Sequence, residues 1–245
     1  MRSSFLTADL DHYALIAADS AGLADAAAGN LGAPVEHCPG WSVADLVRHV
    51  WEVHAFWGQI VELQLADPDD FVAPPDPTAD ALLESFRSGA TRLVDILRAA
   101  DPATPVWTWA SQRDAGFVIR HQVQEAAVHR WDAEHAAGRA FVIHRDAAVD
   151  SIEEFLQFSL GQHPPQPLDG PLALVATDAD AAWTLRPGAD GALNREPGIG
   201  DDATQARATA SDLLLWLYRR RTAAQLEITG DAGALQRFTA YAATD

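Results

Sequence analysis

The chain has 245 residues, 48% of them hydrophobic, which suffices for one large domain or two modest ones with packed cores. Its formal net charge of −18 opposes binding to nucleic acids and to anionic membranes. The single cysteine, Cys38, excludes internal disulfides and multi-cysteine metal sites, and the absence of lysine excludes Schiff-base catalysis and a lysine general base.

The sequence carries no sign of export or membrane insertion. No apolar run approaches the about 18 residues that a spanning helix needs. Acidic residues interrupt the first segment of the chain, where a signal peptide would be apolar. We therefore expect a cytoplasmic protein with neither a membrane nor a nucleic acid as its partner.

Five helices are predicted in the first two thirds of the chain, where apolar residues recur at a spacing of about 3.6 residues. The second helix is the best marked: Ser42 can cap it, and Asp45 follows three residues later, a pattern typical of a capping box. The expected helices cover about residues 7–29, 42–65, from 78 or 80 through Leu97, 115–137 and 146–160.

The pattern changes after residue 160. The stretch "GQHPPQPLDGP" has the composition of a linker, and four short β-leaning runs follow it, "LALVAT", "AAWTL", "ARATA" and "LEITG". A helix, "SDLLLWLYRRR", lies between the last two runs. These patterns predict a helical domain over residues 1–160 and a small α+β domain over residues 169–245.

The fourth predicted helix carries a row of polar residues, His121, Glu125 and His129, at four-residue intervals. Glu125 and His129 are one turn apart, about 6 Å, so they can share a metal ion, and His121 and Glu125 form an equivalent pair. His121 and His129 are about 12 Å apart along the helix, so only one pair can belong to a single site. An exposed row of polar residues explains the same pattern.

A third ligand could come from the second predicted helix. His49 lies among apolar residues two turns into that helix, where an imidazole needs a polar partner. His54 is rotated by about 140° from His49 and is expected to point elsewhere. His49, Glu125 and His129 form a two-histidine, one-carboxylate set that suits zinc with an open position, and equally non-haem iron. Alternatively, His49 is a core histidine with another hydrogen-bond partner.

Three parts of the chain resemble the mycothiol-dependent maleylpyruvate isomerase family, a branch of the DinB-like metalloproteins. They are "CPGWSVADLVRHV" at residues 38–50, "EAAVHRWDAE" at residues 125–134, and "ATASDLLLWLYRRR" with "LEITGD" toward the end. The resemblance covers nearly the whole chain, with both domains in order. It implies an α+β two-domain fold: an N-terminal DinB-like four-helix bundle and a small C-terminal α+β domain.

The resemblance also implies roles for particular residues. Family members hold a divalent metal, usually zinc, through one histidine of the second helix and a Glu-x-x-x-His pair of the fourth, which match His49, Glu125 and His129. His121 is then a neighbour of the site or a surface residue. Family members also carry a catalytic arginine near the end of the chain. It matches Arg220, with Arg221 one position away as the alternative, and Arg219 stands where the family pattern has glycine.

The chemistry that the family implies uses mycothiol, the low-molecular-weight thiol of actinobacteria. The metal favours the thiolate form of its sulfur near neutral pH. In the isomerase, the thiolate adds to the cis double bond of maleylpyruvate, and rotation followed by elimination gives fumarylpyruvate. A lysine-free protein must neutralise a carboxylate-bearing electrophile with arginine, which suits Arg220. We therefore expect a zinc- and mycothiol-dependent isomerase.

Two other functions remain compatible with the same residues. Relatives with this metal site are mycothiol S-transferases, which join the thiol to another electrophile and stop there. A non-enzymatic metal-binding or interaction protein could also keep the fold. Asp132 is placed either to support a ligand or to pair with a surface arginine, Cys38 is expected to be structural or incidental, and Trp107 and Trp109 could line a pocket.

Overall fold

The computed structural model describes residues 10–160, 168–188 and 192–242. The chain divides into two compact units, Met1–Ile143 and His144–Asp245. Within the described ranges, no helix is both long enough and apolar enough to cross a membrane.

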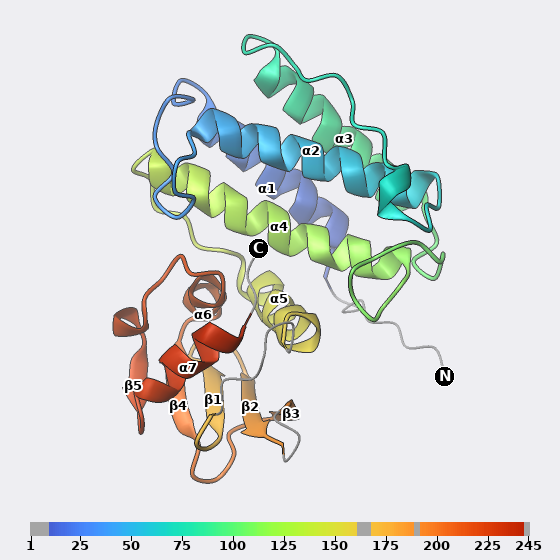
Figure 1. Ribbon diagram of the computed structural model, residues 1–245. Helices are drawn as coiled ribbons and strands as arrows, with labels where there is room; N and C mark the ends of the chain where they lie inside the picture. Colours follow the sequence, from blue (N-terminus) through green and yellow to red (C-terminus); the bar gives the residue numbers. More distant parts are fainter. Residues whose placement is uncertain (1–9, 161–167, 189–191, 243–245) are drawn as a thin grey trace. The chain divides into compact units, whose positions relative to one another are not determined.

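The first unit is a bundle of four long helices (Figure 1). The helix α1 packs against α3 and α4, and α2 packs against the same two helices, so the four form a closed arrangement. A short 3-10 helix, η1, lies in the connection between α2 and α3. The bounds are α1 His12–Ala27, α2 Val43–Glu62, η1 Pro68–Asp70, α3 Leu82–Ala99 and α4 Ala115–Ala136.

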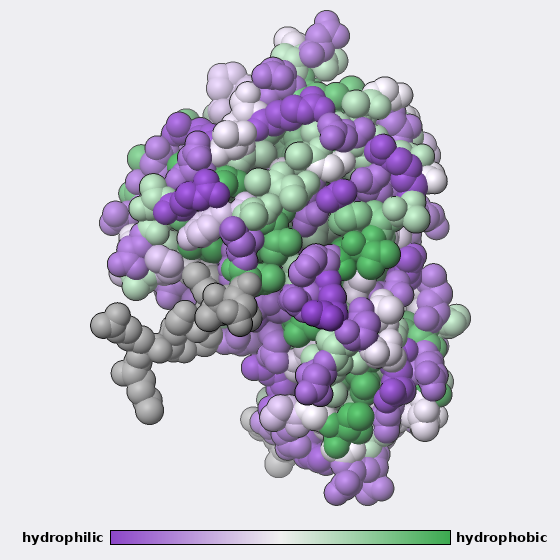
Figure 2. All heavy atoms as spheres, turned by 180° about the vertical axis from the view of Figure 1, so that it is seen from behind, coloured by the Kyte–Doolittle hydropathy of each residue, from purple (hydrophilic) through white to green (hydrophobic). Residues whose placement is uncertain are grey.

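The helices of the bundle bury apolar side chains, and Asp11, Ser42 and Asp114 cap the starts of α1, α2 and α4. The capping box predicted for α2 is confirmed: the amide of Asp45 donates to Ser42 Oγ at 3.3 Å, and the amide of Ser42 donates to Asp45 Oδ2 at 2.8 Å. Fully buried side chains from all four helices, including Ile16, Leu46 and Phe86, form the core. Hydrophilic residues interspersed with smaller apolar areas cover the face in Figure 2.

The second unit contains a five-stranded sheet in the order β3-β2-β1-β4-β5. Neighbouring strands are antiparallel except for β1 and β4, which run parallel. Leu172 of β1 lies opposite Thr204 of β4. The bounds are α5 Arg145–Phe158, β1 Leu172–Ala176, β2 Ala181–Pro187, β3 Leu193–Pro197, β4 Thr204–Ala208, α6 Ala210–Leu217, η2 Ala223–Gln225, β5 Glu227–Thr229 and α7 Gly233–Tyr241.

The sequence pattern predicts a domain boundary near residue 160, after α5, whereas the two compact units divide before this helix. This helix packs against α6, so it belongs to the same compact unit as the sheet, and the division falls between Ile143 and His144. A helical period of apolar residues identifies a helix but does not identify the element against which its apolar face packs. Of the expected linker "GQHPPQPLDGP", residues 161–167 lie outside the described part of the chain.

The two-domain α+β class is confirmed, with a helical first part and a small sheet in the second. Two elements, β3 and α7, were not expected from the sequence. Most residues of β3 are exposed, and it is an edge strand made of one leucine, three polar residues and a proline, so it shows no alternation of apolar and polar residues. The third helix starts at Leu82, a little later than expected.

Candidate metal centre

The structure brings the three predicted metal ligands together. Glu125 Oε1 lies 3.5 Å from His49 Nε2 and 3.3 Å from His129 Nε2. One ligand atom from each residue lies within 4.8 Å of the other two. Ligand atoms bound tetrahedrally to one zinc ion at about 2.0 Å are about 3.3 Å from each other. The donor set therefore fits a single divalent ion without a large rearrangement.

Two neighbouring helices supply these ligands. Glu125 and His129 lie one turn apart on α4, and His49 comes from α2, which packs against α4. The imidazoles of His49 and His129 meet edge to face with their ring centroids 5.2 Å apart. The side chain of His49 is 37% exposed, whereas those of Glu125 and His129 are 15% and 10% exposed. The group is therefore most accessible at His49.

Asp132 holds the imidazole of His129 in place. Its Oδ2 lies 3.0 Å from His129 Nδ1, and its side chain is fully buried. A carboxylate at Nδ1 favours the tautomer in which Nδ1 carries the proton, which leaves the lone pair of Nε2 for a metal. Asp132 therefore contacts the candidate ligand His129, one of the two arrangements that the sequence allowed.

The same contacts set the charges of the group. Burial alone would raise the pKa of Glu125, but the neighbouring His129 and hydrogen bonds with His129 and His49 hold that pKa well below its usual value. Burial would lower the pKa of His129, yet the carboxylates of Glu125 and Asp132 raise it to about 9. The carboxylates therefore stabilise positive charge at this position, whether it comes from a proton or from a metal cation.

His121 lies outside the three-residue ligand group, although it is one turn from Glu125. Its ring stacks on Phe117 at 5.3 Å and meets Trp109 and Trp57 edge to face at 5.6 and 6.0 Å. Trp107 stacks on Trp57 at 6.0 Å. The two loop tryptophans, which could line a pocket by their sequence position, thus pack in an aromatic cluster with this histidine.

His54 points away from the ligand group, as its rotation on the helix predicts. It stacks on Phe86 of α3 with ring centroids 5.5 Å apart and is only 2% exposed. Neither of its ring nitrogens has a hydrogen-bond partner among the described residues. Burial disfavours the charged imidazole and lowers its pKa to about 4, although the charge of Glu125 opposes the shift. His54 is therefore a neutral core residue at physiological pH.

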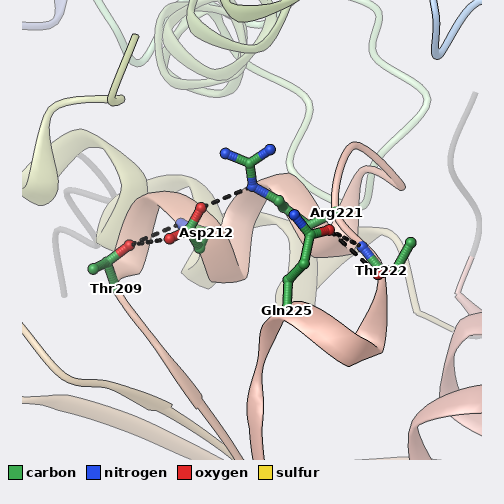
Figure 3. Close-up of polar contacts among 5 residues, drawn as sticks. All are labelled: Thr209, Asp212, Arg221, Thr222 and Gln225. Carbon is green, nitrogen blue, oxygen red and sulfur yellow. Dashed lines mark hydrogen bonds and ion pairs between the residues drawn. The ribbon is translucent and has the colours of Figure 1, made fainter. Parts of the chain in front are cut away.

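The three consecutive arginines of the second unit follow α6 and have different surroundings. Arg221 Nε donates to Asp212 Oδ1 at 2.9 Å, and Figure 3 shows its terminal nitrogens directed away from this carboxylate. Arg220 is 9% exposed, and its Nη1 donates to the carbonyl of Tyr218 at 2.8 Å. Arg219 donates to the carbonyl of Thr239 at 3.0 Å. Each arginine therefore has a local structural contact.

The backbone conformation at Arg219 explains why a glycine is expected at this position. Its φ angle is 62°, in the left-handed region that glycine adopts most easily. The helix α6 ends with paired hydrogen bonds from the amides of Arg219 and Arg220 to the carbonyls of Trp216 and Leu215. This is the Schellman arrangement, which requires the left-handed residue after the cap. The turn thus keeps the expected geometry although arginine replaces glycine.

A second group of potential ligands was not predicted from the sequence: Glu36, His37 and His135 also bring one ligand atom each within 4.8 Å of the others. The sequence shows that Glu36 and His37 are adjacent potential ligands, but no local pattern indicates that they lie next to His135. Cys38, the next residue, packs against the apolar core of the bundle, in agreement with a structural role.

Comparisons with known families cover most of the chain. Residues 13–134 match the mycothiol maleylpyruvate isomerase N-terminal domain, and residues 146–237 match the C-terminal domain of the same family. These two segments correspond closely to the two compact units of the structure. Among proteins with curated descriptions, none matches the sequence significantly.

Two solved structures resemble the whole chain. The crystal structure of the mycothiol-dependent maleylpyruvate isomerase superposes with a TM-score of 0.62 at 14% identity, over 89% of this chain and 92% of that one. A single-substitution mutant of the mycothiol-dependent maleylpyruvate isomerase gives a TM-score of 0.61 at 13% identity, with the same coverage. At this identity the similarity establishes the shared fold.

Proposed function

Because the chain belongs to the mycothiol-dependent maleylpyruvate isomerase family, we propose that it is a divalent-metal enzyme that uses the thiol of mycothiol to attack a small electrophile. The observation that carries this proposal is the convergence of His49, Glu125 and His129 on one point between α2 and α4. Both solved structures described above are of a mycothiol-dependent maleylpyruvate isomerase, and we propose that this chain uses the same thiol.

The three residues fit a zinc ion better than a hard cation. Two imidazoles and one carboxylate are ligands that zinc prefers, whereas magnesium and calcium prefer oxygen ligands alone. Three protein ligands leave a fourth position, and the partial exposure of His49 gives that position access from the surface of the unit. When bound there, a divalent metal would act as a Lewis acid that lowers the pKa of a thiol and favours the thiolate.

The protein residues would then hold the reacting partners and their charges. Asp132 keeps His129 Nε2 directed at the group, and Glu125 supplies the negative charge that a divalent ion requires. Arg220 is the arginine that we propose to contact a carboxylate of the electrophile. Its planar guanidinium matches a carboxylate in two parallel hydrogen bonds.

For an isomerisation, the chemistry is a reversible addition. When bound, mycothiol would supply a thiolate that adds to one carbon of the cis double bond, with the electron pair of that bond delocalised onto the conjugated carbonyl. Rotation about the resulting single bond and expulsion of the thiolate would then give the trans isomer. No net proton or electron is consumed, so the protein needs only to hold the carboxylate and exclude competing reactions.

An S-transferase activity is the alternative outcome at the same site. If the adduct is released before elimination, the product is a mycothiol conjugate. A non-enzymatic metal-binding protein is the second alternative, and it would need no thiol. Incubation with mycothiol and a panel of electrophiles, including maleylpyruvate, separates the three. Formation of the trans isomer supports an isomerase, formation of a mycothiol conjugate supports an S-transferase, and the absence of thiol binding supports a non-enzymatic metal-binding protein.

The metal assignment is tested by elemental analysis of protein purified without added metal. Wild type should carry about one divalent ion per chain, and His49→Ala and His129→Ala should lose most of it, because two ligands rarely retain zinc through purification. His144→Ala is the matched control, since His144 is an exposed histidine of the other unit. Equal and near-stoichiometric metal in wild type and His129→Ala would overturn the assignment.

A further inference from the structure

We propose that Glu36, His37 and His135 form a second binding site for a divalent transition metal, separate from the candidate centre and open to solvent. One ligand atom of each residue lies within 4.8 Å of the other two. The site would join the loop before α2 to the end of α4, two segments that are about a hundred residues apart in the sequence.

The three side chains of this group lie close together and contact one another. His135 Nε2 lies 2.7 Å from Glu36 Oε2, and the rings of His37 and His135 have their centroids 5.7 Å apart. Trp131 contacts both imidazoles: it stacks on His135 at 4.7 Å and meets His37 edge to face at 5.4 Å. The indole thus restricts two of the three side chains before any ion arrives, which lowers the entropy cost of binding.

The loop that carries Glu36 and His37 is itself fixed by backbone hydrogen bonds. The amide of Val35 donates to the carbonyl of Trp41 at 2.9 Å, and the amide of Cys38 donates to the carbonyl of Val35 at 3.2 Å. These hydrogen bonds define the backbone of the turn from which Glu36 and His37 project.

The donors select the kind of ion. Two imidazoles and one carboxylate suit zinc, copper, nickel and cobalt, and they are poor ligands for magnesium or calcium. A metal would replace the hydrogen bond between His135 and Glu36.

This group and the candidate centre can be occupied at the same time. His135 lies six residues beyond His129 on α4, which corresponds to about 9 Å along the helix and a different face. The side chains of Glu36 and His135 are 68% and 41% exposed, in contrast to the largely buried Glu125 and His129. We therefore infer that the second site binds its ion more weakly and fills only when metal is added.

The test is a calorimetric titration of zinc chloride into the full-length protein as purified. Wild type should bind about one further equivalent of zinc. His37→Ala and His135→Ala should lose this binding by about tenfold or more in affinity, while His144→Ala, which removes an exposed histidine elsewhere, should keep it. Added zinc should raise the melting temperature of wild type and His144→Ala but not that of His135→Ala, because an ion that links two segments stabilises only the folded chain.

The His129→Ala variant separates this proposal from the candidate centre. The added-zinc site should persist in His129→Ala whether or not the first metal is lost. Further zinc binding that is the same in wild type, His37→Ala and His135→Ala would overturn the proposal, as would a wild type that takes up no further zinc. In either case the three residues form only a surface ion pair beside a second histidine.

Discussion

At the scale of single residues, charge and hydrogen bonding decide what each histidine of the bundle can do. His129 lies between two carboxylates and its pKa rises, whereas His54 stacks on Phe86, has no hydrogen-bond partner among the described residues, and has a lowered pKa. The two residues have the same side chain and both are buried. Their neighbours therefore separate a candidate metal ligand from a neutral core residue.

Asp132 provides a residue-scale prediction. Replacement by alanine removes the acceptor at His129 Nδ1, so we expect the affinity for the first metal to fall by about 10- to 100-fold. Asp132→Asn should lose less, because its amide oxygen can still accept that hydrogen bond. Competition with a zinc chelator measures the change. Asp25→Asn, which alters an exposed aspartate of the same unit, is the control, and an equal effect in both positions would contradict the proposed role.

His54 provides a prediction on pH dependence. Its folded pKa of about 4 lies below the ordinary value of 6.5, so between these values the unfolded chain binds a proton that the folded chain excludes. The contribution of His54 to the free energy of unfolding should therefore decrease by a total of about 3 kcal/mol as the pH falls from 6.5 to 4. Above pH 6.5 this contribution should not change with pH.

The variant His54→Leu removes the titrating group but retains an apolar side chain. Urea unfolding at several pH values should show a shallower loss of stability in acid for His54→Leu than for wild type. All other titrating groups act in both proteins, so the difference between the two curves isolates His54. Parallel curves would show that its folded pKa is not lowered.

At the scale of elements, helix ends determine where ligand-bearing segments start and stop. The capping box of Ser42 starts α2 about two turns before His49, so it fixes the register of that candidate ligand. The helices α4 and α6 both end in the Schellman arrangement, with Gly138 and Arg219 as the left-handed residues. Glycine adopts this conformation without cost, whereas arginine carries a Cβ and is strained there.

Arg219 gives a prediction at this scale. Arg219→Ala and Arg219→Gly both lose the hydrogen bonds to the carbonyls of Thr239 and Ala242, but only alanine keeps the strained backbone. We expect Arg219→Gly to be more stable than Arg219→Ala by about 1 kcal/mol. Chemical denaturation of the two variants provides the comparison. Equal stabilities would mean that the left-handed turn carries no strain in this protein.

At the scale of the whole molecule, the net charge of −18 and the absence of lysine bear on the carboxylate-bearing substrate that we propose. Such a substrate is repelled by the overall field, so its recognition depends on arginine and on the metal. The family match spans both compact units, which is consistent with a reaction that requires the second unit as well as the bundle. The arginines that follow α6 are therefore the natural place to test substrate binding.

Arg220→Ala should lower mycothiol-dependent turnover by about 10²- to 10³-fold, the scale for loss of one charged donor that acts in the transition state. Because Arg220 is buried and donates to Tyr218, we also expect a loss of about 1 kcal/mol in stability. Turnover is therefore normalised to folded, metal-bound protein. Arg220→Lys retains the charge but loses the planar pair of donors, and it should recover only part of the activity.

Arg221→Ala is the matched control, since it removes the neighbouring arginine and its ion pair with Asp212. Its turnover should stay near that of wild type. A large loss in Arg221→Ala alone would identify Arg221 as the substrate-binding residue, and near-wild-type turnover in Arg220→Ala would exclude the role that we propose for Arg220.

The sequence by itself determined the features that depend on neighbours within a few residues. Helical spacing of apolar residues predicted α2 and α4, the pair Ser42 and Asp45 predicted a capping box, and the four-residue interval placed Glu125 beside His129. These features are local, because helical geometry and capping are set within one or two turns. Strand β3 was not predicted because its mostly polar residues show no alternation of apolar and polar side chains.

Only the tertiary structure decided which distant residues meet. From the residues alone, His49 was either a third ligand beside Glu125 and His129 or a core histidine, and the packing of α2 on α4 brings its Nε2 to 3.5 Å from Glu125 Oε1. In the same way, Glu36 and His37 meet His135, and α5 joins the unit that contains the sheet. Contacts between segments about a hundred residues apart depend on how apolar faces pack, and no local pattern in one segment encodes the position of the other.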